Sequence, residues 1–331
     1  MHNPPSLTPD RACEVLRRAG ITGAASLEII HEYNHVWRLR ADEETFYLKA
    51  FTKPWYTPDA TPNGGPVTHE ASALRCLRVN GLAAPELLLA EDVPRGPPGW
   101  PFLLTQAVPG RSLVSPLWQG EDPVPLMLRV GDYMRRMHAI AFPYPGYITR
   151  KHGPTSPPPE EWRHRCWTAE ARYESALDTF QAHSPQLTAG IRERLENLIA
   201  TIPNRLRSEY ATPHFVHGDC HAHHFFLVQS GGAWSITGTV DMEVASAGYV
   251  GEDFLKLGIE LASLLPVTTR WWEALLQGYG GEPDFGLLKL RMLAAEPAEF
   301  AWPDLWPKRW EDVLRHIFDA ESWHQLFDTG S

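Results

Sequence analysis

The sequence lacks the patterns that mark several common classes of protein. Its four cysteines include no Cys-x-x-Cys pair, which argues against a zinc ribbon or a disulfide scaffold and indicates reduced thiols. No apolar run approaches the length that a bilayer requires, and the N-terminal segment has no basic stretch followed by an apolar one. We therefore expect no membrane segment, no export signal and a cytoplasmic location.

Basic residues are fewer than acidic residues in this sequence. The 331 residues include 30 lysines and arginines against 40 aspartates and glutamates, which gives a formal net charge of -10 at pH 7. This balance argues against binding to nucleic acid or to an anionic membrane and favours a small-molecule substrate. The sequence carries no indication of the oligomeric state.

The composition otherwise fits a folded protein, with 43% hydrophobic and 21% charged residues, and the length favours two lobes that share a cleft. Residues 8–20 predict a short amphipathic helix. Residues 27–51 alternate aromatic and β-branched residues with polar ones, which predicts antiparallel strands, the last of which carries Lys49. A helix over residues 67–81, with Glu70 in its first turns, and two further strands complete this first region.

Beyond a hinge near residue 108 the pattern becomes helical, as at residues 125–140 and in the tryptophan-rich tail 271–327. The proline-rich residues 142–161 predict a surface excursion without regular structure.

The stretch FVHGDCHAHHFF at residues 215–226 places four histidines and one aspartate between apolar segments. A strand lysine, a helical glutamate, this stretch and a later strand ending in Asp241 follow the order of parts that phosphoryl transfer from a nucleotide needs. Positioned cations and metal provide most of the stabilisation in that transition state. For His221 and His223 we favour a simpler role, in which they only make hydrogen bonds with the local backbone.

The motifs resemble those of the aminoglycoside phosphotransferase and choline kinase-like family, a branch of the protein-kinase-like fold. The family signature His-Gly-Asp-x-His-x-x-Asn is matched from His217 onward in all but its last position, which is His224 here. A second family segment is matched from Asp241, with Asp253 twelve residues later. The segments NHVWRL, FYLKAF, LLTQAVPG and RRMHAI are also similar, so the resemblance extends from about Leu27 to Leu261.

This resemblance implies a two-lobed α+β fold. Residues 1–107 would form a small nucleotide-binding lobe with an antiparallel sheet, and residues 108–331 a larger, mainly helical lobe for catalysis and substrate binding. It further implies transfer of the γ-phosphate of ATP or GTP to a hydroxyl of a polar metabolite, with an amino sugar or an aminoglycoside among the candidates. Magnesium would be the metal cofactor, with manganese as the alternative.

The resemblance also implies roles for individual residues. Asp219 would be the catalytic base, and Asp253 and His217 would brace its loop. The expected nucleotide contacts are Lys49 with its ion-pair partner Glu70, Asn34 in the nucleotide loop, and the backbone from Gln106 to Val108 at the adenine. The expected metal ligands are Asp241, His224 and Glu243.

The histidine at position 224 keeps two other hypotheses open. Imidazole nitrogen prefers zinc, copper, iron or nickel, whereas magnesium prefers oxygen, so a kinase-like binding or regulatory protein with weak or no turnover is one alternative. A metal hydrolase that uses His217, Asp219, His221 and His224 is the other.

Overall fold

The structure is a computed structural model in which part of the chain is described. The described residues are 7–23, 25–31, 35–51, 65–92, 99–148, 152–156, 189–190, 192–194, 196–197, 200, 212–286, 289, 316–317 and 319–327. Asn34 therefore lies outside the described residues, as do the tail tryptophans at positions 302, 306 and 310.

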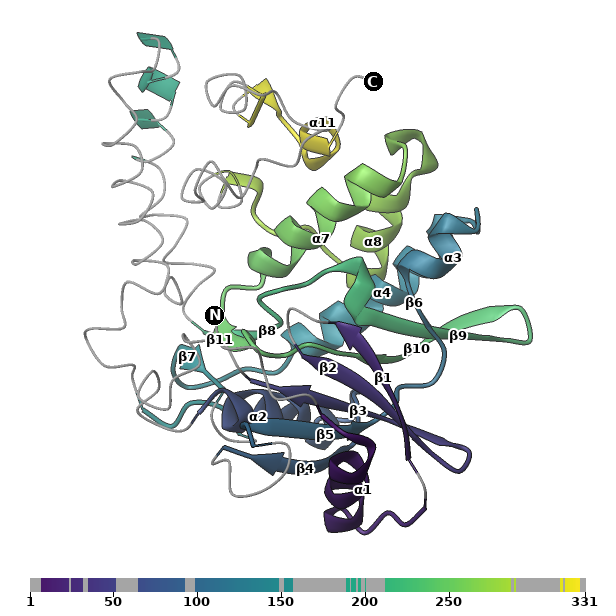
Figure 1. Cartoon of the computed structure of the whole chain (residues 1–331). Coiled ribbons are helices and arrows are strands. Elements are labelled where there is room, and N and C mark those ends of the chain that lie inside the picture. Colours follow the sequence, from purple (N-terminus) through teal and green to yellow (C-terminus); the bar gives the residue numbers. More distant parts are fainter. Residues whose placement is uncertain are drawn as a thin grey trace.

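The small lobe is built on a five-stranded antiparallel sheet with the order β1-β2-β3-β5-β4. Its strands are β1 (Ala25–His31), β2 (Val36–Ala41), β3 (Glu44–Ala50), β4 (Leu87–Glu91) and β5 (Phe102–Gln106). Helix α1 (Pro9–Arg18), capped by the Thr8 side chain, packs against this sheet at the lower end of Figure 1.

Side-chain alternation in β3 decides which face of the sheet carries the lysine. Phe46, Leu48 and Ala50 are buried in the core shared with α1. Because successive side chains of a strand point to opposite faces, Lys49 lies on the other face, beside Phe51. That face is covered by α2 (Pro66–Val79), whose Glu70 is buried there.

Helix α2 packs on both lobes. Val67 and Ala71 form a small apolar cluster with Phe51 and Leu103 of the sheet region. Further along the helix, residues including Leu77 belong to the main core of the large lobe. The segment after the helix is tied to the large lobe as well, because the hydroxyl of Tyr133 donates to the Ala83 carbonyl at 2.6 Å and Arg136 donates to the Gly81 carbonyl at 2.8 Å.

The large lobe combines helices with short strands. Its helical elements are α3 (Val114–Trp118), α4 (Pro123–His138), η5 (Ala222–His224), α7 (Gly251–Leu264), η6 (Val267–Thr269), α8 (Trp271–Tyr279) and α11 (Trp323–Phe327). Its strands are β6 (Arg111–Ser112), β7 (Gly146–Tyr147), β8 (His214–Val216), β9 (Phe225–Ser230), β10 (Ala233–Thr239) and β11 (Ser246–Gly248). They form two three-stranded sheets, β10-β9-β6 and β7-β11-β8, next to the stacked helices α4, α7 and α8 (Figure 1).

Two glycines allow α4 and α8 to cross closely. A Cβ atom at Gly131 would lie 2.2 Å from the Leu275 carbonyl oxygen, and one at Gly278 would lie 2.2 Å from the Leu128 carbonyl oxygen. Any other residue at either position would push the two backbones apart.

The expected α+β architecture, with a small antiparallel-sheet lobe and a larger helical lobe, is confirmed. One local expectation is corrected: the proline-rich segment contains a short strand, β7, because its Gly146–Tyr147 backbone pairs with β11. Within the described part of the chain, none of the helices is long and apolar enough to cross a membrane. The division into lobes at residue 107 stays a prediction.

Candidate active site

The histidine-rich stretch forms a loop between β8 and β9, and its entry requires glycine. Gly218 has φ +78°, and a Cβ atom there would lie 2.6 Å from the Val244 carbonyl oxygen. The buried Asp253 carboxylate at the start of α7 accepts the amide hydrogens of His217 at 2.8 Å and Gly218 at 2.9 Å. His138 contacts the same carboxylate at 3.0 Å, so the loop is fixed to two helices.

Both ring nitrogens of His217 form hydrogen bonds with backbone groups. Nε2 donates to the Val240 carbonyl at 3.0 Å, and Nδ1 accepts the Asp219 amide hydrogen at 3.3 Å. The ring thereby joins the loop to the end of β10. Neither nitrogen is available to a metal ion, which argues against the metal hydrolase hypothesis.

Asp219 lies in this loop with one of its oxygens held by cations. Oδ1 is 2.7 Å from Lys256 Nζ and 3.2 Å from His221 Nε2. Burial would raise the pKa of the Asp219 carboxyl, but His221 and Lys256 outweigh burial and hold the pKa well below its ordinary value. Asp219 is therefore ionised at neutral pH, and within the described part of the chain Oδ2 has no hydrogen-bond partner.

Asp241 lies two residues after the end of β10 and adopts a left-handed backbone conformation, with φ +64°. Its carboxylate forms an ion pair with Lys49. The Lys49 ammonium also lies 2.9 Å from Glu70 Oε2 and 3.0 Å from Glu243 Oε2. Burial alone would lower the pKa of Lys49, but these three carboxylates keep the pKa well above its ordinary value.

Glu70 is the most deeply buried of these three acids, with 6% of its side chain exposed. Burial raises the pKa of its carboxyl to about 7, although the Lys49 charge acts in the opposite direction. Even beside the lysine, a carboxyl with this pKa is only partly ionised at neutral pH, and without the lysine its pKa would be higher still.

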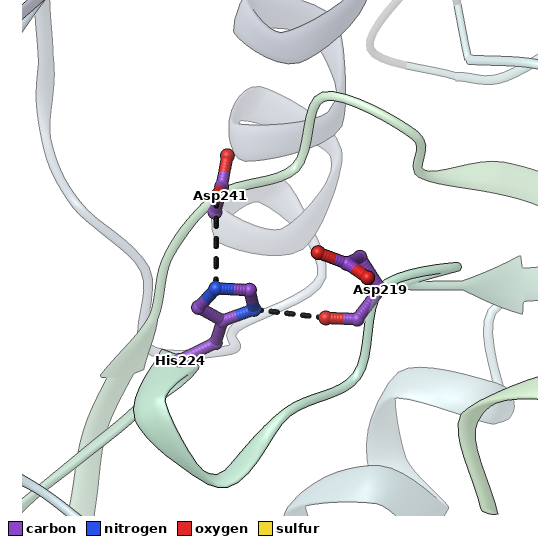
Figure 2. A group of neighbouring side chains, drawn as sticks. All are labelled: Asp219, His224 and Asp241. Atoms are coloured by element: carbon purple, nitrogen blue, oxygen red, sulfur yellow. Dashed lines mark hydrogen bonds and ion pairs between the residues drawn. The ribbon is translucent and has the colours of Figure 1, made fainter. Parts of the chain in front are cut away.

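His224 bridges the two aspartates (Figure 2). Its Nδ1 lies 2.8 Å from the Asp219 carbonyl oxygen, and its Nε2 lies 3.6 Å from Asp241 Oδ2. Burial and the neighbouring His217 lower the pKa of His224 to about 4, so the ring is neutral at pH 7. Because a carbonyl oxygen only accepts, Nδ1 carries the single proton, and the lone pair of Nε2 faces Asp241.

The donor set near Asp241 fits a divalent metal ion. Ligand atoms of Asp219, His224 and Asp241 lie within 4.8 Å of one another, and so do those of Glu70, Asp241 and Glu243. Carboxylate oxygens suit magnesium and manganese, whereas the imidazole nitrogen suits manganese better than magnesium. Asp241 belongs to both groups and is the residue best placed to hold such an ion.

Two backbone amides of the hinge, at residues 106 and 107, already donate hydrogen bonds to other backbone groups of the protein. The Gln106 amide donates to the Glu86 carbonyl, and the Ala107 amide donates to the Thr45 carbonyl, both at 2.9 Å. The Val108 amide has no such partner among the described residues. Of the expected adenine contacts, Val108 therefore offers a free donor, and Gln106 has only its carbonyl to offer.

Two residues of this site were not predicted from the sequence: Lys256, which contacts Asp219, and Glu260, which lies four residues further along α7. Glu260 accepts the Ala222 amide hydrogen, and its carboxylate lies 3.4 Å from both His221 and His223. We expected His221 and His223 to make hydrogen bonds only with the local backbone, and this expectation is wrong. Both rings contact the Glu260 carboxylate, and His221 also contacts the Asp219 carboxylate. The signal in the sequence was the spacing of Asp253, Lys256 and Glu260, which places three charged residues on one helical face.

The small antiparallel sheet, helix α2 and the larger helical lobe form the two-lobed protein-kinase-like fold. The sequence matches the phosphotransferase enzyme family over residues 29–293. The chain therefore belongs to this family, as its motifs predicted. A search of curated proteins found no match.

Solved structures with the same fold share little sequence with this chain. A provisionally assigned aminoglycoside phosphotransferase from Ralstonia eutropha JMP134 is 14% identical, with a TM-score of 0.55 over 98% of this chain and 94% of that one. The GDP complex of aminoglycoside 2'-phosphotransferase-IIIa is 14% identical, with a TM-score of 0.54 over 92% and 94%. The streptomycin-ATP complex of APH(2")-IIa is 13% identical, with a TM-score of 0.52 over 98% and 95%.

Proposed function

We propose that this protein is a small-molecule kinase, which transfers the γ-phosphate of ATP or GTP to a hydroxyl group of a polar metabolite. The observation that carries the proposal is the convergence of Asp219, Asp241 and Lys49, which are far apart in the sequence, at one site. Phosphoryl transfer needs a base for the acceptor hydroxyl, a carboxylate for the metal and a cation for the phosphates, and these three residues supply them.

Each residue has a distinct task in the proposed reaction. The free oxygen of Asp219, Oδ2, would accept the proton of the acceptor hydroxyl as that oxygen attacks the phosphorus. Asp241, with His224 and Glu243, would hold the divalent metal ion. When bound, this ion would neutralise negative charge on the phosphates. Lys49 would contact the phosphates and Val108 the adenine.

Amino sugars and aminoglycosides are the first acceptors to test, because two of the structures above are described as aminoglycoside phosphotransferases in complex with a nucleotide. The test is incubation of the protein with labelled ATP or GTP, magnesium or manganese, and a panel of polar metabolites. We expect transfer that is abolished in Asp219→Ala and retained in a surface control such as Asp132→Asn on α4. Transfer that persists in Asp219→Ala would refute the assignment.

A second candidate function rests on His224. The family signature has asparagine at this position, and the imidazole nitrogen is a poor magnesium ligand. A kinase-like binding or regulatory protein would bind nucleotide, as a thermal shift would show, yet transfer no phosphate with any metal. It would also gain no activity from His224→Asn, whereas an active kinase would keep or improve its magnesium-dependent rate.

A further inference from the structure

Three charged residues on one face of α7 contact the loop that carries Asp219. Asp253 accepts the first two amide hydrogens of the loop, Lys256 contacts the Asp219 side chain, and Glu260 accepts the Ala222 amide hydrogen. Their spacing of three and four residues brings them onto the same side of the helix. One helix therefore determines where the loop begins, where its acidic side chain points and where it ends.

The contacts of Lys256 and Glu260 are connected through His221. Lys256 and His221 both approach Oδ1 of Asp219, at 2.7 and 3.2 Å, and His221 reaches Glu260 with its other nitrogen at 3.4 Å. The side chain of Glu260 is only 9% exposed, whereas that of Lys256 is 39% exposed. The carboxylate of Asp219 is thus fixed through one oxygen from two directions.

Such an arrangement matters for a base that must face an incoming hydroxyl. An Asp side chain rotates about two bonds, and a catalytic group must be held close to its productive geometry to work well. With Oδ1 held, Oδ2 keeps one orientation, and in the described part of the chain it is the oxygen of Asp219 without a partner that could accept a proton.

We propose that Lys256 and Glu260 are positioning residues for Asp219, with Lys256 acting directly on its carboxylate and Glu260 acting through His221. This inference rests on the proposed kinase function for its kinetic consequence, and on the contact geometry alone for its structural one. Neither residue belongs to the motifs from which the family was recognised.

The kinetic test compares Lys256→Met and Lys256→Arg with the full-length wild-type chain. We expect Lys256→Met to lower kcat about 10- to 100-fold, as misplaced catalytic groups do, with the KM for nucleotide unchanged. Lys256→Arg, which keeps the charge, should restore most of kcat. The matched control is Arg129→Met, which removes an exposed cation from α4 of the same lobe and should leave kcat unchanged.

Glu260→Gln tests the indirect contact. It keeps an acceptor for the Ala222 amide hydrogen and removes the charge that faces His221, so we expect a smaller loss of kcat than in Lys256→Met. A loss confined to KM, an equal loss in Arg129→Met, or no rescue by Lys256→Arg would overturn the positioning role of Lys256. A loss in Glu260→Gln larger than that in Lys256→Met would overturn the indirect role of Glu260.

A second measurement does not depend on turnover. Thermal unfolding of Asp219→Asn, Lys256→Met and the double variant should give Tm shifts of the single variants that fail to add, because the two side chains are in contact. Additive shifts would overturn the contact. If wild-type protein transfers no phosphate to any acceptor, the proposed function fails. The comparison of Tm shifts between the single and double variants still decides whether Lys256 holds Asp219.

Discussion

The two aspartates of the site are held by different parts of the molecule. Among the residues that the structure describes, the cations that contact Asp219, Lys256 and His221, both belong to the large lobe, and they hold its pKa low. Asp241 also belongs to the large lobe, yet its ion-pair partner Lys49 comes from the small-lobe sheet. The proposed base is therefore prepared within one lobe, whereas the proposed metal and phosphate side depends on how the two lobes meet.

The largest expected effect separates these two aspartates. Asp219→Asn should lower kcat about 10²- to 10⁴-fold, the usual contribution of general base catalysis, and leave nucleotide affinity unchanged. Asp241→Asn should lower both kcat and the metal-dependent affinity for nucleotide, because it removes a carboxylate that belongs to both candidate metal groups. Steady-state kinetics and calorimetry of nucleotide binding measure the difference. Equal effects of the two variants on affinity would contradict the comparison.

The next effect concerns the junction between the lobes. Lys49→Met leaves the carboxylates of Glu70, Asp241 and Glu243 without their shared cation, so we expect the free energy of unfolding to fall by about 3 kcal/mol. Urea unfolding at pH 7 measures it. Lys49→Arg should retain most of the stability, and Arg75→Met, an exposed cation on α2, is the control. Unchanged or increased stability of Lys49→Met would show that the ion pairs are not a net stabilising feature.

A change within the large lobe and away from the site should have a smaller effect. Gly131→Ala should lower the free energy of unfolding by about 1–3 kcal/mol, because its methyl group would meet the α8 backbone. Gly281→Ala is the matched control, since nothing lies within 4 Å of a Cβ atom there. Nucleotide affinity should not change in either variant. Unfolding midpoints that are identical for the two variants would contradict the close crossing of α4 and α8.

The smallest expected effect is a change of metal preference. Wild-type protein should bind manganese in preference to magnesium, and His224→Asn should shift that ratio toward magnesium by about tenfold, the lower end of what changes around metal ligands produce. Calorimetric titration of each metal in the presence of a nucleotide measures binding independently of turnover. Asn80→His, at the exposed C-cap residue of α2, is a control for added imidazole. A ratio that does not move would remove His224 from the proposed metal site.

The sequence predicted the site residues whose positions depend on local strand patterns. Lys49 was placed by the alternation of its strand, and Asp241 by the strand that precedes it. Both inferences use short-range patterns, and the fold then brings these residues together. The roles assigned to these residues remain proposals, and Asn34 lies outside the described residues.

The missed residues depended on long-range contacts. Lys256 and Glu260 look in the sequence like an ordinary charged face of a helix, because nothing local shows that the loop at residues 217–224 packs against that face. His221 and His223 were misread for the same reason, since their partner Glu260 is more than thirty residues away in the chain. Spacing on α7 becomes informative only after Asp253 is known to hold the loop.

The double attachment of α2 constrains how the two lobes can move relative to each other. Val67 and Ala71 pack on the small-lobe sheet, whereas Leu77 belongs to the large-lobe core, so movement of the strands away from the large lobe would strain both this packing and the contact between Lys49 and Glu70. The distance between the Lys49 ammonium and the Glu70 carboxylate would therefore increase as the two lobes move apart. The pKa of Glu70 is already about 7 with the lysine beside it, so loss of the lysine would raise that pKa further and favour uptake of a proton.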